Sequence, residues 1–265
     1  MASDSRLKAT DSLLLLAQHN DIAAVCDETR QAIDQLMWNR TLRSKDDDFI
    51  TFLRRSSGYA SAAIDGAAMP DDPAREPDNS AMGIVAQHGL LITAMADTLG
   101  DSFKHSPAQV WARLHSLIST DDDRGAPRLN DDVQDPLRLG NIPPASEARE
   151  RMRHLGEQLI TSQAPAVLLS AIAHAEISVT QPFAYGSHLI ARATARLVLA
   201  ARDLDTKGVT APEIGWYLQG RPSYVTALKQ YQSGTIEGVT AFVQWHCEGI
   251  RKGINATEQA LANAQ

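Results

Sequence analysis

The chain has little of what extracellular, membrane and nucleic-acid-binding proteins depend on. Its 265 residues include two cysteines, Cys26 and Cys247, too few for a disulfide framework. The net charge is −7 and no basic block is present, which disfavours nucleic acid as a partner. The apolar run at 13–17 is far too short to span a membrane, and no signal-peptide cleavage pattern accompanies it. We therefore expect a cytoplasmic protein with no membrane segment and no nucleic-acid partner.

Strand patterns are also missing. Aromatic residues make up 5% of the chain, and no segment alternates apolar and polar residues with a period of two. Apolar residues instead recur at helical spacing, which predicts an all-α fold. We expect one helical domain spanning residues 1–265. Its expected parts are N-terminal helices in 1–105, a core in 106–206 and C-terminal helices in 207–265.

The common catalytic and metal-binding motifs are absent. His174-Ala-Glu176 is followed by no Cys-x-x-Cys pair, and His246-Cys247 lacks two further ligands at metal spacing. No phosphate-binding Walker loop and no Gly-x-Ser-x-Gly elbow occurs. We predict no metal site from these residues.

What the chain does contain is a polar loop between two very apolar segments, 165–178 and 189–204. Pro182 should end the first helix before it, and Gly186 can adopt a positive φ. Ser187 is a good N-cap for a helix that begins at His188. Backbone N–H groups at such a helix start favour an anion, and Arg192 adds positive charge one turn later. An ordinary helix start without a ligand is the alternative.

This loop resembles the signature of the Fic family, His-Pro-Phe-x-(Asp/Glu)-Gly-Asn-Gly-Arg-x-x-Arg. Four positions agree with it, namely Pro182, Phe183, Gly186 and Arg192. His174, seven residues before Gln181, also falls where the upstream helix of the family often carries a histidine. The departures are Gln181 for the catalytic His, Tyr185 for the metal-binding acid, Ser187 for Asn, His188 for the second Gly and Leu189 for the first Arg.

A second segment, Ser61-Ala-Ala-Ile-Asp65-Gly66, resembles the inhibitory motif of the same family, (Ser/Thr)-x-x-x-Glu-(Gly/Asn). The resemblance implies that Asp65 pairs with Arg192. Taken by itself, the segment indicates a helix that ends at Gly66. The family order also places a β-hairpin flap in the loop at 125–140, and we expect its remnant at 128–139. By analogy, a protein target would bind there.

Active Fic proteins transfer AMP from ATP to a protein hydroxyl, and their histidine takes the hydroxyl proton. Gln181 cannot act as a base, because an amide has no titratable proton near neutral pH. Tyr185 is a poor Mg²⁺ ligand, and Leu189 removes a guanidinium that would hold phosphate. We therefore expect a catalytically impaired Fic-fold protein that binds a nucleotide or anion through Gly186, Ser187, His188 and Arg192, or that has a regulatory role. ATP and Mg²⁺ are implied by the resemblance alone.

Two other functions stay open. In the first, the protein is an active nucleotidyl- or phosphotransferase with a non-standard site, in which His188 or His174 is the base and Tyr185 a nucleophile or acid. In the second, it is a purely structural or protein-interaction module whose site is closed by the Asp65–Arg192 pair. A homodimer contact through Trp216, Tyr217 and Tyr224 is a further expectation.

Overall fold

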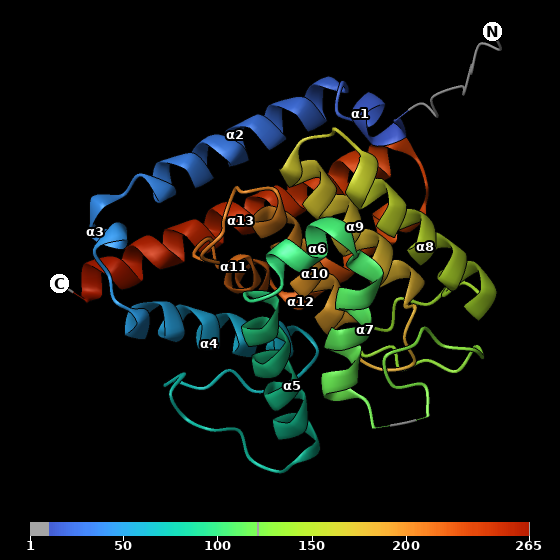
Figure 1. Cartoon of the computed structure of the whole chain (residues 1–265), viewed down its shortest axis with the longest axis horizontal. Coiled ribbons are helices and arrows are strands. Elements are labelled where there is room, and N and C mark those ends of the chain that lie inside the picture. The colour runs from blue at the N-terminus through green and yellow to red at the C-terminus, as the bar shows by residue number, and fades with distance from the viewer. Residues whose placement is uncertain (1–10, 121, 265) are drawn as a thin grey trace, which may run out of the picture.

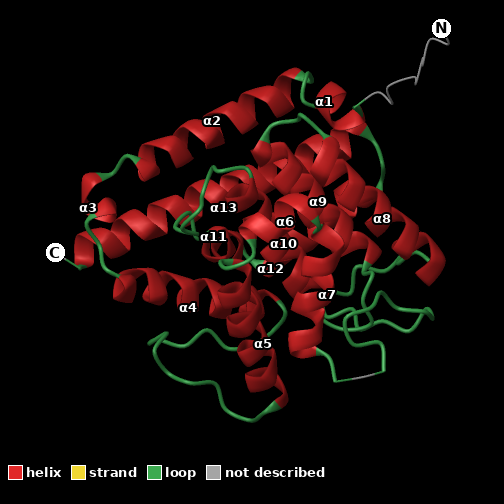
Figure 2. Cartoon of the chain, viewed as in Figure 1, coloured by secondary structure: helices red, strands yellow, loops and turns green. Residues whose placement is uncertain are grey.

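A computed structural model describes residues 11–120 and 122–264 of the chain. Within these ranges all regular elements are helices, and no strand is present (Figure 2). The first seven helices are α1 (Ser12–Leu16), α2 (Asn20–Met37), α3 (Arg40–Arg43), α4 (Asp47–Ile64), α5 (Ala81–Ala96), α6 (Gly100–His105) and α7 (Pro107–Ile118). They are followed by α8 (Ala145–Thr161), α9 (Ala166–Thr180), α10 (Ser187–Ala201), α11 (Pro212–Gln219), α12 (Arg221–Gln232) and α13 (Ile236–Asn263). The all-α prediction is confirmed. The β-hairpin expected at 128–139 is wrong, because this segment is a loop.

Local sequence explains where the helices begin. The side chains of Asp46, Ser80 and Thr235 each accept a hydrogen bond from a backbone N–H in the first turn of α4, α5 and α13. Pro107 and Pro212 open α7 and α11, where a missing N–H costs nothing. These helix starts are therefore encoded by residues within the first turn of each helix.

The helices α9 and α10 lie at the centre of the protein, antiparallel and joined by the signature-like loop (Figure 1). Nearly every residue of both helices is buried, because other helices surround them on all sides. The long helix α13 packs against α9, α11 and α12, and α2 covers it from outside. On the other side, α4 and α5 form a pair that contacts α10. The two very apolar segments of the sequence therefore form the centre of the fold.

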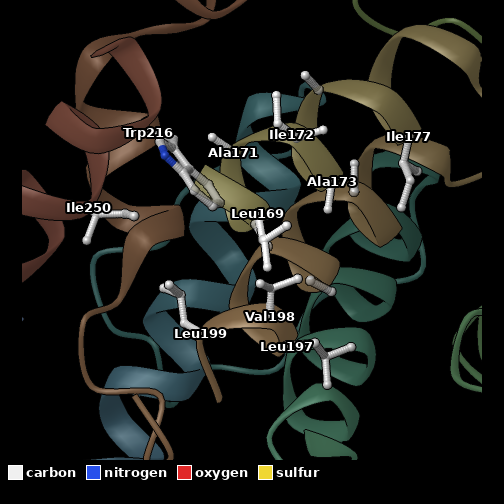
Figure 3. Close-up of a cluster of buried hydrophobic side chains, with 14 of the residues drawn as sticks. Leu169, Ala171, Ile172, Ala173, Ile177, Leu197, Val198, Leu199, Trp216 and Ile250 are labelled. Atoms are coloured by element: carbon white, nitrogen blue, oxygen red, sulfur yellow. The ribbon is translucent and has the colours of Figure 1, made fainter. Parts of the chain in front are cut away.

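The main hydrophobic core is one connected cluster of buried side chains, contributed by residues that range along the chain from Leu13 in α1 to Leu261 in α13. Figure 3 shows its centre, where the side chains of α9 and α10 meet Trp216 of α11 and Ile250 of α13. Full burial of a valine, leucine or isoleucine side chain in this core stabilises the folded state by about 1.5–3 kcal/mol. Cys26 and Cys247 are both buried in this core as free thiols.

A buried arginine also fastens α10 to its neighbours. Arg196 donates hydrogen bonds to Asp97 Oδ1 at 2.6 Å, Glu213 Oε2 at 3.0 Å and the carbonyl oxygen of Gly208 at 2.6 Å. Burial opposes its charge, but the two carboxylates outweigh burial and raise the pKa of Arg196. Arg196 is thus a structural ion-pair residue that lies away from the loop.

Two expectations about the surface can be compared with the structure. In the ranges described, none of the helices combines the length and the hydropathy that crossing a bilayer would require. Trp216 and Tyr224 are fully buried inside the protein, so they cannot line a dimer contact, contrary to our expectation. Tyr217 is partly exposed, and a homodimer stays an untested prediction.

Candidate functional site

The loop between α9 and α10 has a positive φ near each end, at Gln181 and at Gly186, and only the glycine adopts this conformation without strain. Gly186 has φ of +75°, as predicted, and a Cβ atom there would lie 2.3 Å from Cδ1 of Ile118. Gln181 also has a positive φ, +44°, although it is not glycine. A residue in this region costs about 1–3 kcal/mol of strain, which the surrounding packing must offset.

Ser187 does not cap α10 as expected. It is the first residue of the helix, and Gly186 occupies the N-cap position without a side chain. The Ser187 hydroxyl accepts a hydrogen bond from the N–H of Phe183 at 3.0 Å and donates one to the carbonyl oxygen of Phe183 at 3.0 Å. Its polar group therefore closes the loop on itself, because the turn brings these two residues together.

The Asp65–Arg192 pair implied by the inhibitory-like motif is formed. Arg192 donates from Nη2 to Oδ2 of Asp65 at 2.7 Å and from Nε to Oγ of Ser61 at 2.8 Å. Asp65 caps the C-terminus of α4, and Gly66 follows with φ of +113°, as expected for a helix end. The α4 C-terminus thus reaches the face of α10 that carries Arg192.

This ion pair is deeply buried. The side chain of Arg192 is fully inaccessible, and that of Asp65 is 7% exposed. Burial opposes the charge of Arg192, but the Asp65 carboxylate outweighs burial and raises its pKa. Nη1 of Arg192 has no hydrogen-bond partner, and the guanidinium carbon lies 6.0 Å from the ring centre of Tyr224. Arg192 is therefore occupied by its own chain.

The segment at 128–140 covers the loop from outside, and we name it the covering segment. Its backbone binds the loop twice, from Arg128 N–H to Pro182 O at 2.8 Å and from Gln134 N–H to Ala184 O at 2.8 Å. The buried side chain of Arg128 also donates to the carbonyl oxygen of Gln181 at 2.8 Å. The segment occupies the place expected for the flap, but it lies against the loop as a single irregular segment without β-structure.

Three polar side chains meet beneath the covering segment. His188 Nε2 lies 3.8 Å from Oδ1 of Asp135, and Gln181 is beside the same carboxylate. Burial opposes ionisation of Asp135, but His188, the Gly140 N–H and Gln181 together lower the pKa of Asp135. The ring nitrogens of His188 and both amide atoms of Gln181 are buried without hydrogen-bond partners. Polar atoms without hydrogen-bond partners are therefore buried between the loop and the covering segment. Asp135 is a neighbour of His188 that was not predicted from the sequence.

Tyr185 occupies the signature position of the metal-binding acid. Its hydroxyl is 2.6 Å from Nδ1 of His88 on α5, another residue that the sequence did not indicate. Burial, with a contribution from the nearby charge of Asp65, raises the pKa of Tyr185 to about 12. Tyr185 is therefore a neutral phenol at neutral pH, already hydrogen-bonded within the protein.

A small recess of about 120 Å³ remains at the start of α10. Of the predicted nucleotide- or anion-binding residues, Gly186, Ser187 and His188 line it, whereas Arg192 does not. Asp65 also lines it, while Ser61, Gly66 and Gln181 do not. The predicted anion-binding residues are therefore not all together, because the side chain of Arg192 turns toward α4 and leaves Gly186, Ser187 and His188 at the recess.

Buried side chains of α9, α12 and α13 form a hydrogen-bonded chain that was not predicted from the sequence. His174 Nδ1 is 3.1 Å from Nδ1 of His246, and His174 Nε2 is 2.7 Å from the hydroxyl of Tyr224. Nε2 of His246 is 3.1 Å from Oγ of Ser170, whose hydroxyl donates to the carbonyl oxygen of Ala195. That donation makes His246 the donor to Ser170, and because burial disfavours the charged form of His246, its Nδ1 accepts from Nδ1 of His174. Burial lowers the pKa of both histidines, that of His246 to about 3.

Comparison with solved structures shows which known fold this architecture matches. A Fic family protein from Desulfovibrio desulfuricans G20 aligns with a TM-score of 0.72 and 16% identity, over 91% of this chain and 75% of that one. A Fic domain containing signaling protein from Bacteroides thetaiotaomicron VPI-5482 aligns with a TM-score of 0.63 and 12% identity, over 90% of this chain and 98% of that one. The chain has the Fic fold.

At the level of sequence, neither a family model nor a curated protein matches this chain. The Fic fold was nevertheless expected from the resemblance of the loop and of the segment at 61–66 to two motifs of that family. Asp65 and Arg192 of these segments are 127 positions apart in sequence and meet in space. Identities of 12–16% show the fold alone, so the chemistry has to be judged from the residues themselves.

The residues present do not fit Mg²⁺–ATP. Hard cations need carboxylate or carbonyl oxygens, but Tyr185 is a neutral phenol and Asp65 is paired with Arg192. The recess of about 120 Å³ is far smaller than the roughly 300–1,000 Å³ of sites that bind ligands of drug size. Leu189 supplies no charge for a triphosphate.

Proposed function

We propose that this Fic-fold protein does not transfer AMP and acts instead as an anion-binding or regulatory protein. The position of Arg192 supports this proposal most strongly. This side chain is buried, neutralised by Asp65 and turned away from the recess at Gly186. A cation in that state cannot hold a phosphate group unless the pair first opens.

The missing catalytic groups support the same proposal. General-base catalysis is worth about 10²–10⁴-fold in rate, and Gln181 supplies none. Loss of one electrostatic donor commonly costs about 10²–10³-fold, and Leu189 replaces such a donor by analogy with the signature. These losses need not multiply, since groups of one site act together, but each alone would leave activity very low.

The recess fits a small anion better than a nucleotide. It lies at the positive end of α10, a helix of 15 residues, where backbone N–H groups favour negative charge. His188 lines it, is 2% exposed and has no hydrogen-bond partner on either ring nitrogen. An anion of the size of inorganic phosphate would give this ring a partner, and the charge of Asp65 is already matched by Arg192.

One observation favours a second candidate, an active transferase with a non-standard base. Asp135 lies beside His188, and a carboxylate next to a histidine is a common way to orient a base. The other members of this candidate are less suitable. His174 is buried with both ring nitrogens hydrogen-bonded, and the pKa of Tyr185 near 12 disfavours a tyrosine nucleophile.

A regulatory role would also need a protein partner, which we propose to bind at the covering segment. Leu129 on this segment is 81% exposed and would offer an apolar contact to such a partner. A contact there would act on the loop directly, because Arg128 next to it holds the backbone of Gln181 and Pro182. Such a partner would be expected in the cytoplasm.

Calorimetric titration tests the anion proposal. Inorganic phosphate should bind the wild type weakly and His188→Gln at least several-fold more weakly, while His19→Gln, at an exposed site, should match the wild type. AMP and ATP, with or without Mg²⁺, should bind no more tightly than phosphate. Saturable ATP binding that is tighter than phosphate binding would contradict the proposal.

Transfer of labelled AMP from ATP tests the catalytic part. Neither the wild type nor Gln181→His should label itself or added protein above background, because Tyr185, Leu189 and the Asp65–Arg192 pair still block the site. Labelling by the wild type that is lost in His188→Gln would establish the second candidate in place of the first.

A further inference from the structure

A larger pocket, separate from the loop recess, lies between α7 and α8. Its volume is about 350 Å³, within the range of roughly 300–1,000 Å³ that small-molecule sites occupy. Phe183 of the loop contributes to it, whereas the recess is lined by residues 185–189. Its walls are mainly apolar, including Pro107, Ala108, Trp111, Ala112, Met152 and Gly156.

The pocket is open because small residues stand where the two helices face each other. Ala108 and Ala112 are one turn apart on α7, and Gly156 of α8 faces Trp111. A Cβ atom at Gly156 would lie 3.4 Å from Cζ3 of Trp111, so the indole ring uses the space that glycine leaves. The indole Nε1 donates to Thr194 Oγ1 at 2.9 Å, which leaves the rest of the ring as an apolar wall.

Arg149 brings a positive charge to the lining of the pocket. Nη1 of Arg149 donates to the carbonyl oxygen of Arg128 at 3.0 Å, and no carboxylate of the described residues forms an ion pair with Arg149. Arg153, also at the rim, is instead paired with both Glu150 and Glu157. The guanidinium of Arg149 is therefore available to an anionic group that enters the pocket.

Together these features define the chemistry of a ligand. An apolar wall requires an apolar body, and Arg149 requires a single anionic group at one end of it. A guanidinium matches a carboxylate with two parallel hydrogen bonds. At about 30 Å³ for each water-sized unit, a pocket of about 350 Å³ holds roughly a dozen non-hydrogen atoms.

We propose that this pocket binds a small monocarboxylic acid, with its apolar body between Trp111 and Met152 and its carboxylate at Arg149. The site is independent of the recess at α10, so it does not depend on the function proposed above. The bound acid would contact Phe183 of the loop, whereas His188 does not line this pocket.

Paired probes test the charge. The probes are 4-phenylbutyrate, with 12 non-hydrogen atoms by its formula (roughly the number the pocket holds), and the neutral 4-phenylbutanol, compared by calorimetry on the full chain. We expect the acid to bind at least about tenfold more tightly than the alcohol, because the alcohol lacks the charge-assisted hydrogen bonds. Equal binding of both, or no binding of the acid, would overturn the proposal.

Matched variants test the location. Arg149→Gln should reduce binding of the acid to that of the alcohol, whereas Arg153→Gln, whose arginine is already paired, should leave the preference nearly unchanged. Ala112→Leu should weaken both probes, since it fills the pocket from its wall, and its unfolding temperature shows whether the fold survives. Loss of the preference in Arg153→Gln with retention in Arg149→Gln would refute the assignment, as would unchanged binding in a folded Ala112→Leu.

Discussion

Replacing Asp65 with alanine should destabilise the protein severely, although the residue lies at the end of a helix beside a loop. Asp65 is the only carboxylate that the described structure places in an ion pair with Arg192. The variant would leave a guanidinium fully buried, with Ser61 as its remaining side-chain hydrogen-bond partner. Water cannot replace the lost charge without entering the centre of the protein.

The size of the effect follows from the burial of the two groups. Removing one partner of a buried ion pair typically costs about 3–5 kcal/mol, because the other charge stays behind without compensation. For a protein of this size each kcal/mol lowers the melting temperature by about 2–4 °C. We therefore expect a decrease of about 6–20 °C.

Urea unfolding monitored by circular dichroism measures this loss, and the exposed pair of Arg30 and Asp34 is the matched control. The side chains of that pair are 54% and 44% exposed, so Asp34→Ala should cost no more than about 0.5 kcal/mol. The double variant Asp65→Leu, Arg192→Met should recover much of the stability, since it buries no charge. The reasoning is refuted if Asp65→Ala is no more destabilising than Asp34→Ala.

Two further predictions concern stability. The pKa values of His174 and His246 are lowered in the folded state, so the unfolded chain binds protons first as the pH falls below about 6.5, and the free energy of unfolding should fall by about 2–4 kcal/mol between pH 7 and pH 5 in urea titrations. A constant free energy over this range would show that these rings are not held neutral. Gly186→Ala should cost about 1–3 kcal/mol more than Gly234→Ala, which shares a positive φ but has no atom within 4 Å of the new Cβ, and equal melting temperatures would rule out the contact with Ile118.

Much of this fold is local information. Caps such as Asp46, Ser80 and Thr235 act on N–H groups within three residues, so their effect can be predicted from the chain alone. Pro182 fixes its own φ and Gly186 permits a positive φ, and both effects are equally local. The pairing of Asp65 with Arg192 also followed from the sequence, but only because both residues belong to motifs that resemble those of one family.

The covering segment shows where local reasoning ended. A β-hairpin was expected at 128–139, but two backbone hydrogen bonds of this segment go to Pro182 and Ala184, and its one internal backbone bond, from Arg138 N–H to Asp135 O, closes a turn and forms no strand ladder. Its place beside the loop was anticipated, and its conformation was not. The fully buried Arg128, which holds it there, would ordinarily be predicted at the surface.

The sequence by itself determined the helices, the bend between α9 and α10 and the absence of a base at Gln181, since each depends on residue type and near neighbours. Only the tertiary structure decided what the polar side chains bind. Arg128 could have lain at the surface, yet it is buried and donates to the carbonyl oxygen of Gln181, and Tyr224 could have been an apolar contact, yet it is hydrogen-bonded to His174. A side chain takes the partner that packing brings within about 3 Å, and these partners come from segments that are distant in the chain.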